Sequence, residues 1–119
     1  MNSELRQILE RDFPSIQGEV LARVLRFYDL LVAENAVQNL TRLISPQDFA
    51  EGHLVDVLEL RKSEFLRFPA MDLGSGGGVP GLLAACFSAE PWLLVDSEKK
   101  KADFLSRAAA ELGLSHVRA

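Results

Sequence analysis

The sequence of 119 residues has only one cysteine, two histidines and fewer basic than acidic residues. The single thiol, Cys86 in the apolar run 82–87, has no partner for a disulfide within one chain. We therefore expect a buried, unreactive thiol in a reducing compartment. The formal net charge of −4 excludes an overall positive field of the kind that drives non-specific binding to nucleic acids. Any contact with RNA must come from a local basic patch.

Long apolar runs are also missing, since no stretch approaches the roughly 18 apolar residues of a membrane-spanning helix. Residues 1–13 alternate charged and apolar side chains, which is unlike a secretory signal. We therefore expect a cytoplasmic protein without a membrane partner. Apolar residues make up 48% of the chain, which at this length suits one domain with a single core.

Helical periodicity dominates the first part of the chain. Apolar residues at positions 5–9 predict a short helix that ends before Pro14, and those at 20–32 predict a long amphipathic helix. Ser45, followed by proline and then an acidic residue, is typical of a helix start, and we expect this third helix to reach about Lys62.

Short apolar runs alternate with helix-like segments after Pro69. The expected order is a strand at 70–73, a helix at 80–90, a strand at 92–96, a helix at 97–112 and the beginning of a strand at 115–119. Such alternation is typical of a parallel sheet covered by helices. The sequence thus predicts an α/β fold in which 1–65 form an N-terminal helical extension and 66–119 the first half of an α/β domain, together one compact unit.

The segment MDLGSGGGVPG, residues 71–81, contains five glycines between a predicted strand and a helix that begins near Pro80. Bare backbone of this kind allows a ligand to approach the chain closely. The alternative is a glycine-rich turn without a ligand. A plain turn needs only one or two glycines, however, so we expect a binding loop.

Two classes of ligand fit this loop. Residues 76–81 match the G-x-G-x-x-G pattern of dinucleotide sites, with Asp96 about 20 residues further on. S-adenosylmethionine sites instead combine an acid after the first strand, here Asp72, with G-x-G-x-G at 74–78 and an acid after the second strand. A carboxylate repels a pyrophosphate and attracts the methionine ammonium, so Asp72 favours S-adenosylmethionine. Asp96 would then accept hydrogen bonds from the ribose hydroxyls, unless it only caps the next helix.

Four segments together resemble one family. MDLGSGGGVPG, LLVDSEKKKADFL at 93–105, NLTRL at 39–43 and HLVDVLEL at 53–60 are similar to the bacterial 16S ribosomal RNA guanine-7-methyltransferases, also called the glucose-inhibited division protein B family. The resemblance implies a Rossmann-like, S-adenosylmethionine-dependent methyltransferase fold with an N-terminal helical extension. It also implies 7-methylguanosine formation in 16S ribosomal RNA of the 30S subunit. Val79 and Val57 depart from the family's usual phenylalanine and serine.

The resemblance also implies a set of site residues. Those expected at the methionine and ribose are Asp72, Gly74, Ser75, Gly76 and Gly78, and those expected at the ribose and adenine are Asp96 and Ser97. His53 and Asp56 share a helix face and are candidates for the mouth of the site, or form an ordinary surface pair. Lys99 and Lys100 are candidates for RNA phosphate contacts, or belong to a solvated helix face. No catalytic residue is assigned, because transfer to a guanine ring nitrogen needs alignment more than a general base. No metal ligand is assigned.

The predicted sheet is short for a methyltransferase of this class, which has seven strands. One interpretation is a C-terminally truncated form of the enzyme. Another is a non-catalytic relative that binds S-adenosylmethionine or only dimerises, with two copies pairing their exposed sheet edges as a homodimer. The remaining alternative is an NAD-binding oxidoreductase.

Overall fold

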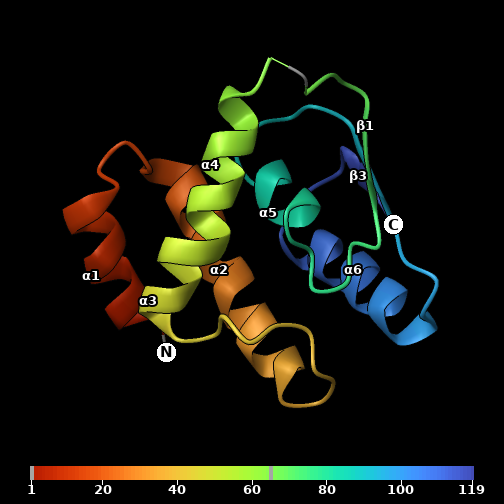
Figure 1. Ribbon diagram of the computed structural model, residues 1–119, viewed down its shortest axis with the longest axis horizontal. Helices are drawn as coiled ribbons and strands as arrows, with labels where there is room; N and C mark the ends of the chain where they lie inside the picture. The colour runs from red at the N-terminus through yellow and green to blue at the C-terminus, as the bar shows by residue number, and fades with distance from the viewer. Residues whose placement is uncertain (1, 65) are drawn as a thin grey trace.

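A computed structural model describes residues 2–64 and 66–119 and places helices before a small sheet (Figure 1). The elements are α1 (Ser3–Asp12), α2 (Gly18–Asn35), α3 (Pro46–Asp48), the π-helix η1 (Phe49–Leu54), α4 (Val55–Lys62), β1 (Ala70–Leu73), α5 (Gly81–Ala85), β2 (Trp92–Val95), α6 (Lys99–Glu111) and β3 (Val117–Arg118). This order confirms the predicted helical segment followed by alternating strands and helices.

The three strands form a parallel sheet in the order β1-β2-β3. In the register of β1 and β2, Asp72 lies opposite Leu94 and Leu73 opposite Val95. Because parallel strands end at the same edge of a sheet, the segments that follow β1 and β2 begin side by side. This edge brings together the glycine loop and Asp96.

Helices cover one face of the sheet in the described part of the chain. Ala70, Trp92 and Leu94 alternate along β1 and β2 with more exposed neighbours and are buried under α5 and α6. The other face carries four exposed apolar side chains, Met71, Leu73, Leu93 and Val95, of which Leu73 is 73% exposed. Strand side chains alternate between the two faces, so this bare face follows directly from the sequence pattern.

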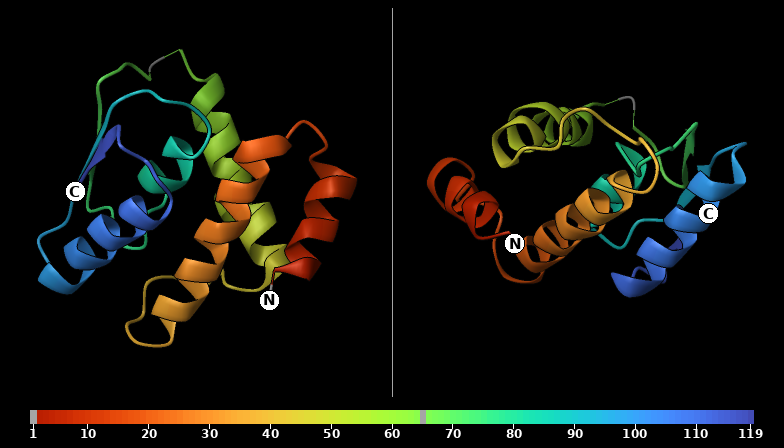
Figure 2. Two further views of the ribbon diagram at one scale, coloured as in Figure 1. Left: turned by 180° about the vertical axis from the view of Figure 1, so that it is seen from behind. Right: turned by 90° about the horizontal axis from the view of Figure 1, so that it is seen from below.

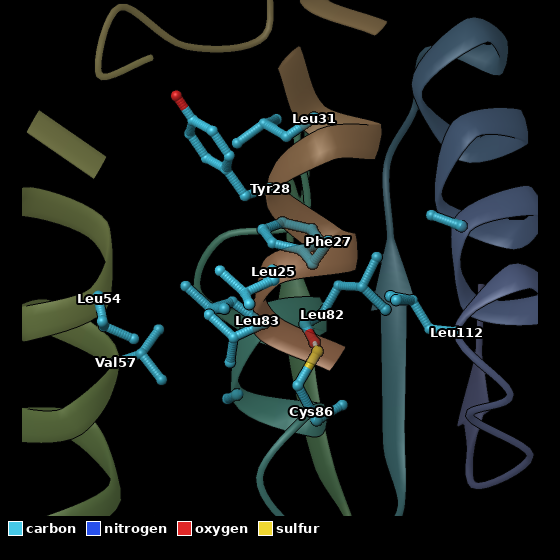
Figure 3. Close-up of a cluster of buried hydrophobic side chains, with 14 of the residues drawn as sticks. Leu25, Phe27, Tyr28, Leu31, Leu54, Val57, Leu82, Leu83, Cys86 and Leu112 are labelled. Carbon is cyan, nitrogen blue, oxygen red and sulfur yellow. Dashed lines mark hydrogen bonds between the residues drawn. The ribbon is translucent and has the colours of Figure 1, made fainter. Parts of the chain in front are cut away.

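One hydrophobic core joins the helical segment to the sheet. In Figure 3, Leu54 and Val57 lie on one side of α2, while Leu112 lies on its other side, toward α6. The views in Figures 1 and 2 agree that α2 lies between α1 and α6. Residues from both sides of position 65 therefore belong to the same core.

The third predicted helix has the expected limits but is not uniform. Ser45 Oγ accepts a hydrogen bond from Asp48 N (3.1 Å), which confirms the predicted N-cap. The residues Phe49–Leu54 then take π-helical geometry before α4 continues. Within η1, a Cβ at Gly52 would lie 2.5 Å from Leu43 Cδ1, so glycine lets the preceding segment pack against this turn.

The helix after the glycine loop is shorter than predicted. It begins directly after Pro80, as expected, but α5 ends at Ala85 and not near residue 90. Side chains from other elements bind the carbonyl groups at its end: Arg23 Nε donates to Cys86 O (2.9 Å), and His116 Nε2 lies 3.0 Å from Ala85 O. These tertiary contacts replace a further helical turn.

None of the helices in residues 2–64 and 66–119 is long and apolar enough to cross a bilayer.

Candidate functional site

The glycine loop folds back onto the end of β2. Gly74 N and Ser75 N both donate to Val95 O, at 2.7 and 3.0 Å, and Gly78 N donates to Ser75 O at 2.7 Å. Ser75 Oγ donates to the carbonyl of Asp72 (2.8 Å), and the Ser75 side chain is only 1% exposed. Ser75 therefore shapes the loop from within.

Asp72 lies at the end of β1, where its side chain reaches the start of α5. Its Oδ2 accepts a hydrogen bond from Gly81 N at 3.0 Å, and the residue is half-buried. A carboxylate offers about four lone-pair sites, so this contact leaves capacity for a further donor. The predicted ligand residue is thus held in one orientation beside the loop.

Asp96 follows β2 and joins the glycine loop to the start of α6. Its Oδ1 accepts from Glu98 N and its Oδ2 from Gly76 N, both at 2.9 Å. The hydrogen bonds from Glu98 and Gly76, together with the positive charge of Lys101, hold the pKa of Asp96 below its usual value. Glu98 is the N-cap residue of α6, so the bond from its amide to Asp96 lies before the helix and does not cap its first turn. The Asp96 carboxylate instead joins the glycine loop to the segment that leads into α6.

Gly74 and Gly76 form the open part of the loop. Their φ angles are +72° and +47°, a region that other residues rarely adopt. A Cβ at Gly74 would meet nothing within 4 Å, and one at Gly76 only Gly74 O at 3.8 Å. The backbone at these two positions is therefore accessible to a ligand.

Gly77 and Gly78 face the protein instead. A Cβ at Gly77 would lie 3.1 Å from Leu40 Cβ, and one at Gly78 would lie 3.1 Å from Phe27 Cε1. The helical segment thus occupies the space that these glycines leave free. The predicted site residue Gly78 is buried, so a ligand at the loop would meet the backbone of its neighbours more readily.

His53 has a different partner from the one that its spacing suggests. Its Nε2 lies 2.7 Å from Thr41 Oγ1, and its ring packs edge-on against Phe49, with centroids 6.0 Å apart. Burial lowers the pKa of His53, while the charge of the exposed Asp56 raises it. Sequence reasoning did not single out Thr41, although the polar threonine inside NLTRL was a signal. Thr41 is also one of the residues at 39–42 that line a cavity of about 500 Å³.

The lysines at the start of α6 are partly neutralised. Lys99 Nζ lies 3.2 Å from Asp103 Oδ2 in an exposed ion pair. Lys100 is exposed, and its carbonyl accepts a hydrogen bond from Gln38 Nε2 at 3.1 Å. Ser97, between Asp96 and these lysines, is exposed as well. The predicted RNA-contacting lysines thus lie in the first turn of α6, the helix that follows Asp96.

The parallel sheet, its helices and the acid-flanked glycine loop define a Rossmann-like α/β fold. Residues 20–119 match the family described as rRNA small subunit methyltransferase G, and the chain belongs to this family. The family resemblance noted in the sequence is therefore confirmed.

Several curated relatives carry the name ribosomal RNA small subunit methyltransferase G. The protein from Solibacter usitatus is 42% identical over 117 residues, which cover 96% of this chain and 54% of the relative. The protein from Sphingopyxis alaskensis is 41% identical over 104 residues, covering 83% of this chain and 43% of the relative. The protein from Acinetobacter baumannii is 36% identical over 118 residues, covering 96% and 54%. The chain spans about half the length of these relatives.

Proposed function

We propose that the carboxyl edge of the sheet binds S-adenosylmethionine and that this chain provides the cofactor-binding part of a methyltransferase. The observation that carries the proposal is the position of Asp96, whose two oxygens are fixed by the amides of Gly76 and Glu98. An ionised carboxylate held in this way presents its remaining lone pairs to a pair of ribose hydroxyls.

The charges of the site favour this cofactor over a dinucleotide. The amide of Gly81 at the start of α5, which would face a pyrophosphate, already binds the carboxylate of Asp72. The negative charge of Asp72 repels a pyrophosphate and attracts the ammonium group of S-adenosylmethionine, whereas an acid at the position of Asp96 fits the ribose of either ligand. We therefore disfavour the NAD-binding alternative.

Each proposed ligand residue has a distinct role. Asp72 receives the methionine ammonium, and Asp96 with the exposed Ser97 meets the ribose and adenine. Gly74 and Gly76 offer open backbone, whereas Ser75 and Gly78 keep the loop in shape through their mutual hydrogen bond. When bound, S-adenosylmethionine supplies a sulfonium methyl group that a guanine ring nitrogen accepts through its lone pair. The chain therefore needs to align the two partners and need not supply a general base.

Titration calorimetry with S-adenosylmethionine tests the cofactor assignment. We expect wild-type protein to bind, Asp96→Ala to lose binding, and the matched control Asp103→Ala, an exposed acid on α6, to retain it. We also expect that NADH does not compete. Equal affinity in Asp96→Ala, or displacement by NADH, would contradict the assignment.

The proposed substrate is small-subunit ribosomal RNA, with 7-methylguanosine as the product. The proposal is supported by membership in the rRNA small subunit methyltransferase G family and by the exposed Lys100 in the first turn of α6, the helix that follows Asp96. His53 and Asp56 are further candidates for the mouth of the site. Transfer of labelled methyl groups to unmodified 30S subunits would support this function.

A second candidate is a cofactor-binding module without catalysis, since the contacts described for Asp72 and Asp96 bear on cofactor binding alone. Binding of S-adenosylmethionine without methyl transfer would select this candidate. Sedimentation of the same preparation would test the associated homodimer, in which the edge of β1 that no described strand pairs with meets a second copy.

A further inference from the structure

A short segment between α2 and α3, residues 39–44 and here called the strap, lies against the glycine loop. In Figure 1 the strap leads from the end of α2 back to α3. Asn35, the last residue of α2, fixes its beginning, because Asn35 Oδ1 accepts hydrogen bonds from Leu40 N (2.8 Å) and Thr41 N (3.0 Å). The side chain that ends α2 thus determines the path of the strap.

The far end of the strap is held by α2 and η1. Tyr28 Oη donates to Ile44 O at 2.6 Å, and the Tyr28 side chain is nearly fully buried. Leu43 packs onto Gly52 of η1, where a Cβ would come within 2.5 Å of Leu43 Cδ1. Both ends are therefore anchored to the helical segment.

The middle of the strap is held by the hydroxyl of Thr41. Thr41 Oγ1 accepts from Leu43 N (3.0 Å) and also lies within hydrogen-bond distance of His53 Nε2 (2.7 Å). The edge-on contact with Phe49 fixes the plane of the His53 ring. One hydroxyl thus connects the strap to η1.

Leu40, next to Thr41, is the strap residue that packs against the glycine loop. A Cβ at Gly77 would lie 3.1 Å from Leu40 Cβ and 3.2 Å from Leu31 Cδ1, so these leucines fill the space beside this glycine. The preceding residue, Gly76, donates its amide to Asp96. A shift of Leu40 would therefore change the support of the Gly76 amide.

We propose that the strap positions the cofactor loop: the Thr41–His53 hydrogen bond holds Leu40 against Gly77 and so keeps the Gly76 amide directed at Asp96. Thr41 and His53 are positioning residues in this account, since they act through the strap and need not touch a ligand. The effect on S-adenosylmethionine rests on the proposed function, whereas the effect on the loop does not.

Amide hydrogen exchange measured by NMR tests the effect on the loop without any ligand. Thr41→Val keeps the shape of the side chain and removes the hydroxyl, and Thr41→Ser keeps the hydroxyl. We expect exchange at Gly76 and Gly78 to rise about fivefold or more in the valine variant and to return to the wild-type rate in the serine variant. The amide of Leu112, the residue that directly follows α6, donates to Ala108 O at 2.9 Å, serves as the reference and should not change.

Two results of this experiment overturn the proposal. One is unchanged exchange at Gly76 and Gly78 in Thr41→Val, and the other is an equal rise at Leu112, which would indicate general destabilisation.

Calorimetry of the same variants then tests the link to the cofactor. We expect affinity for S-adenosylmethionine to fall about fivefold in Thr41→Val and to recover in Thr41→Ser. Unchanged affinity in Thr41→Val would overturn the link to the cofactor. Absence of binding by the wild-type protein would instead refute the proposed function and leave the exchange result to decide whether the strap positions the loop.

Discussion

Gly81, the first residue of α5, packs tightly against side chains of β1 and β2. A Cβ there would lie 2.5 Å from Leu94 Cδ2 and 2.7 Å from Asp72 Oδ2. Contacts this short require α5 to move away from β2 or the Asp72 carboxylate to rotate away from Gly81 N. We therefore expect Gly81→Ala to cost about 1–3 kcal/mol, the usual range for overpacking. For a domain of this size, that loss corresponds to a decrease in melting temperature of about 4–12 °C.

Thermal unfolding followed by circular dichroism measures this effect, and Gly113→Ala is the matched control. Gly113 has a φ of +68°, and a Cβ there would meet nothing within 4 Å, so alanine adds backbone strain without a clash. Gly81 contacts Asp72 and Gly113 does not. We therefore expect Gly81→Ala also to weaken S-adenosylmethionine binding and Gly113→Ala to leave it unchanged. A Gly81→Ala protein with the wild-type melting temperature would refute the proposed packing of α5.

Three further predictions concern other positions. Tyr28→Phe removes the donor to Ile44 O and should lower the free energy of unfolding by about 1 kcal/mol or more in urea titrations; an unchanged urea midpoint would contradict this. The pKa of Asp96 is lowered in the folded state, so its stabilisation is present above the unfolded pKa of about 3.9 and is lost as the pH falls through the folded pKa. The difference in unfolding free energy between wild type and Asp96→Ala should therefore shrink below about pH 4, and a constant difference would argue against this role. Burial raises the pKa of Cys86 to about 12, so a thiol reagent should modify it at least about a hundredfold faster in denaturant than in the folded protein; equal rates would show that Cys86 is accessible.

The sequence predicted the elements of the fold because their signals are local. Apolar spacing in α2, the Ser45 cap and the alternation of burial along β1 and β2 depend on residues close together in the chain. The expectation of a buried thiol at Cys86 is confirmed for the same reason, since it lies in an apolar run. The positions of Asp72 and Asp96 beside the loop follow from the shared edge of parallel strands.

Contacts between distant segments were beyond sequence reasoning. The glycines at 77 and 78 look like those at 74 and 76 in the sequence, yet only the structure places Leu40 and Phe27 against the former pair. The early end of α5 depends on side chains from α2 and from the segment before β3. Likewise, the partner of His53 comes from the strap, 12 residues earlier in the chain, and not from its own helix.

The central claim is that the carboxyl edge of the sheet binds S-adenosylmethionine, and an NMR titration of isotope-labelled protein with this cofactor tests it most directly. We predict that the amide signals of Gly74, Gly76 and Asp96 shift most and saturate together. Shifts confined to the bare face of the sheet around Leu93, or no shifts at all, would contradict the claim.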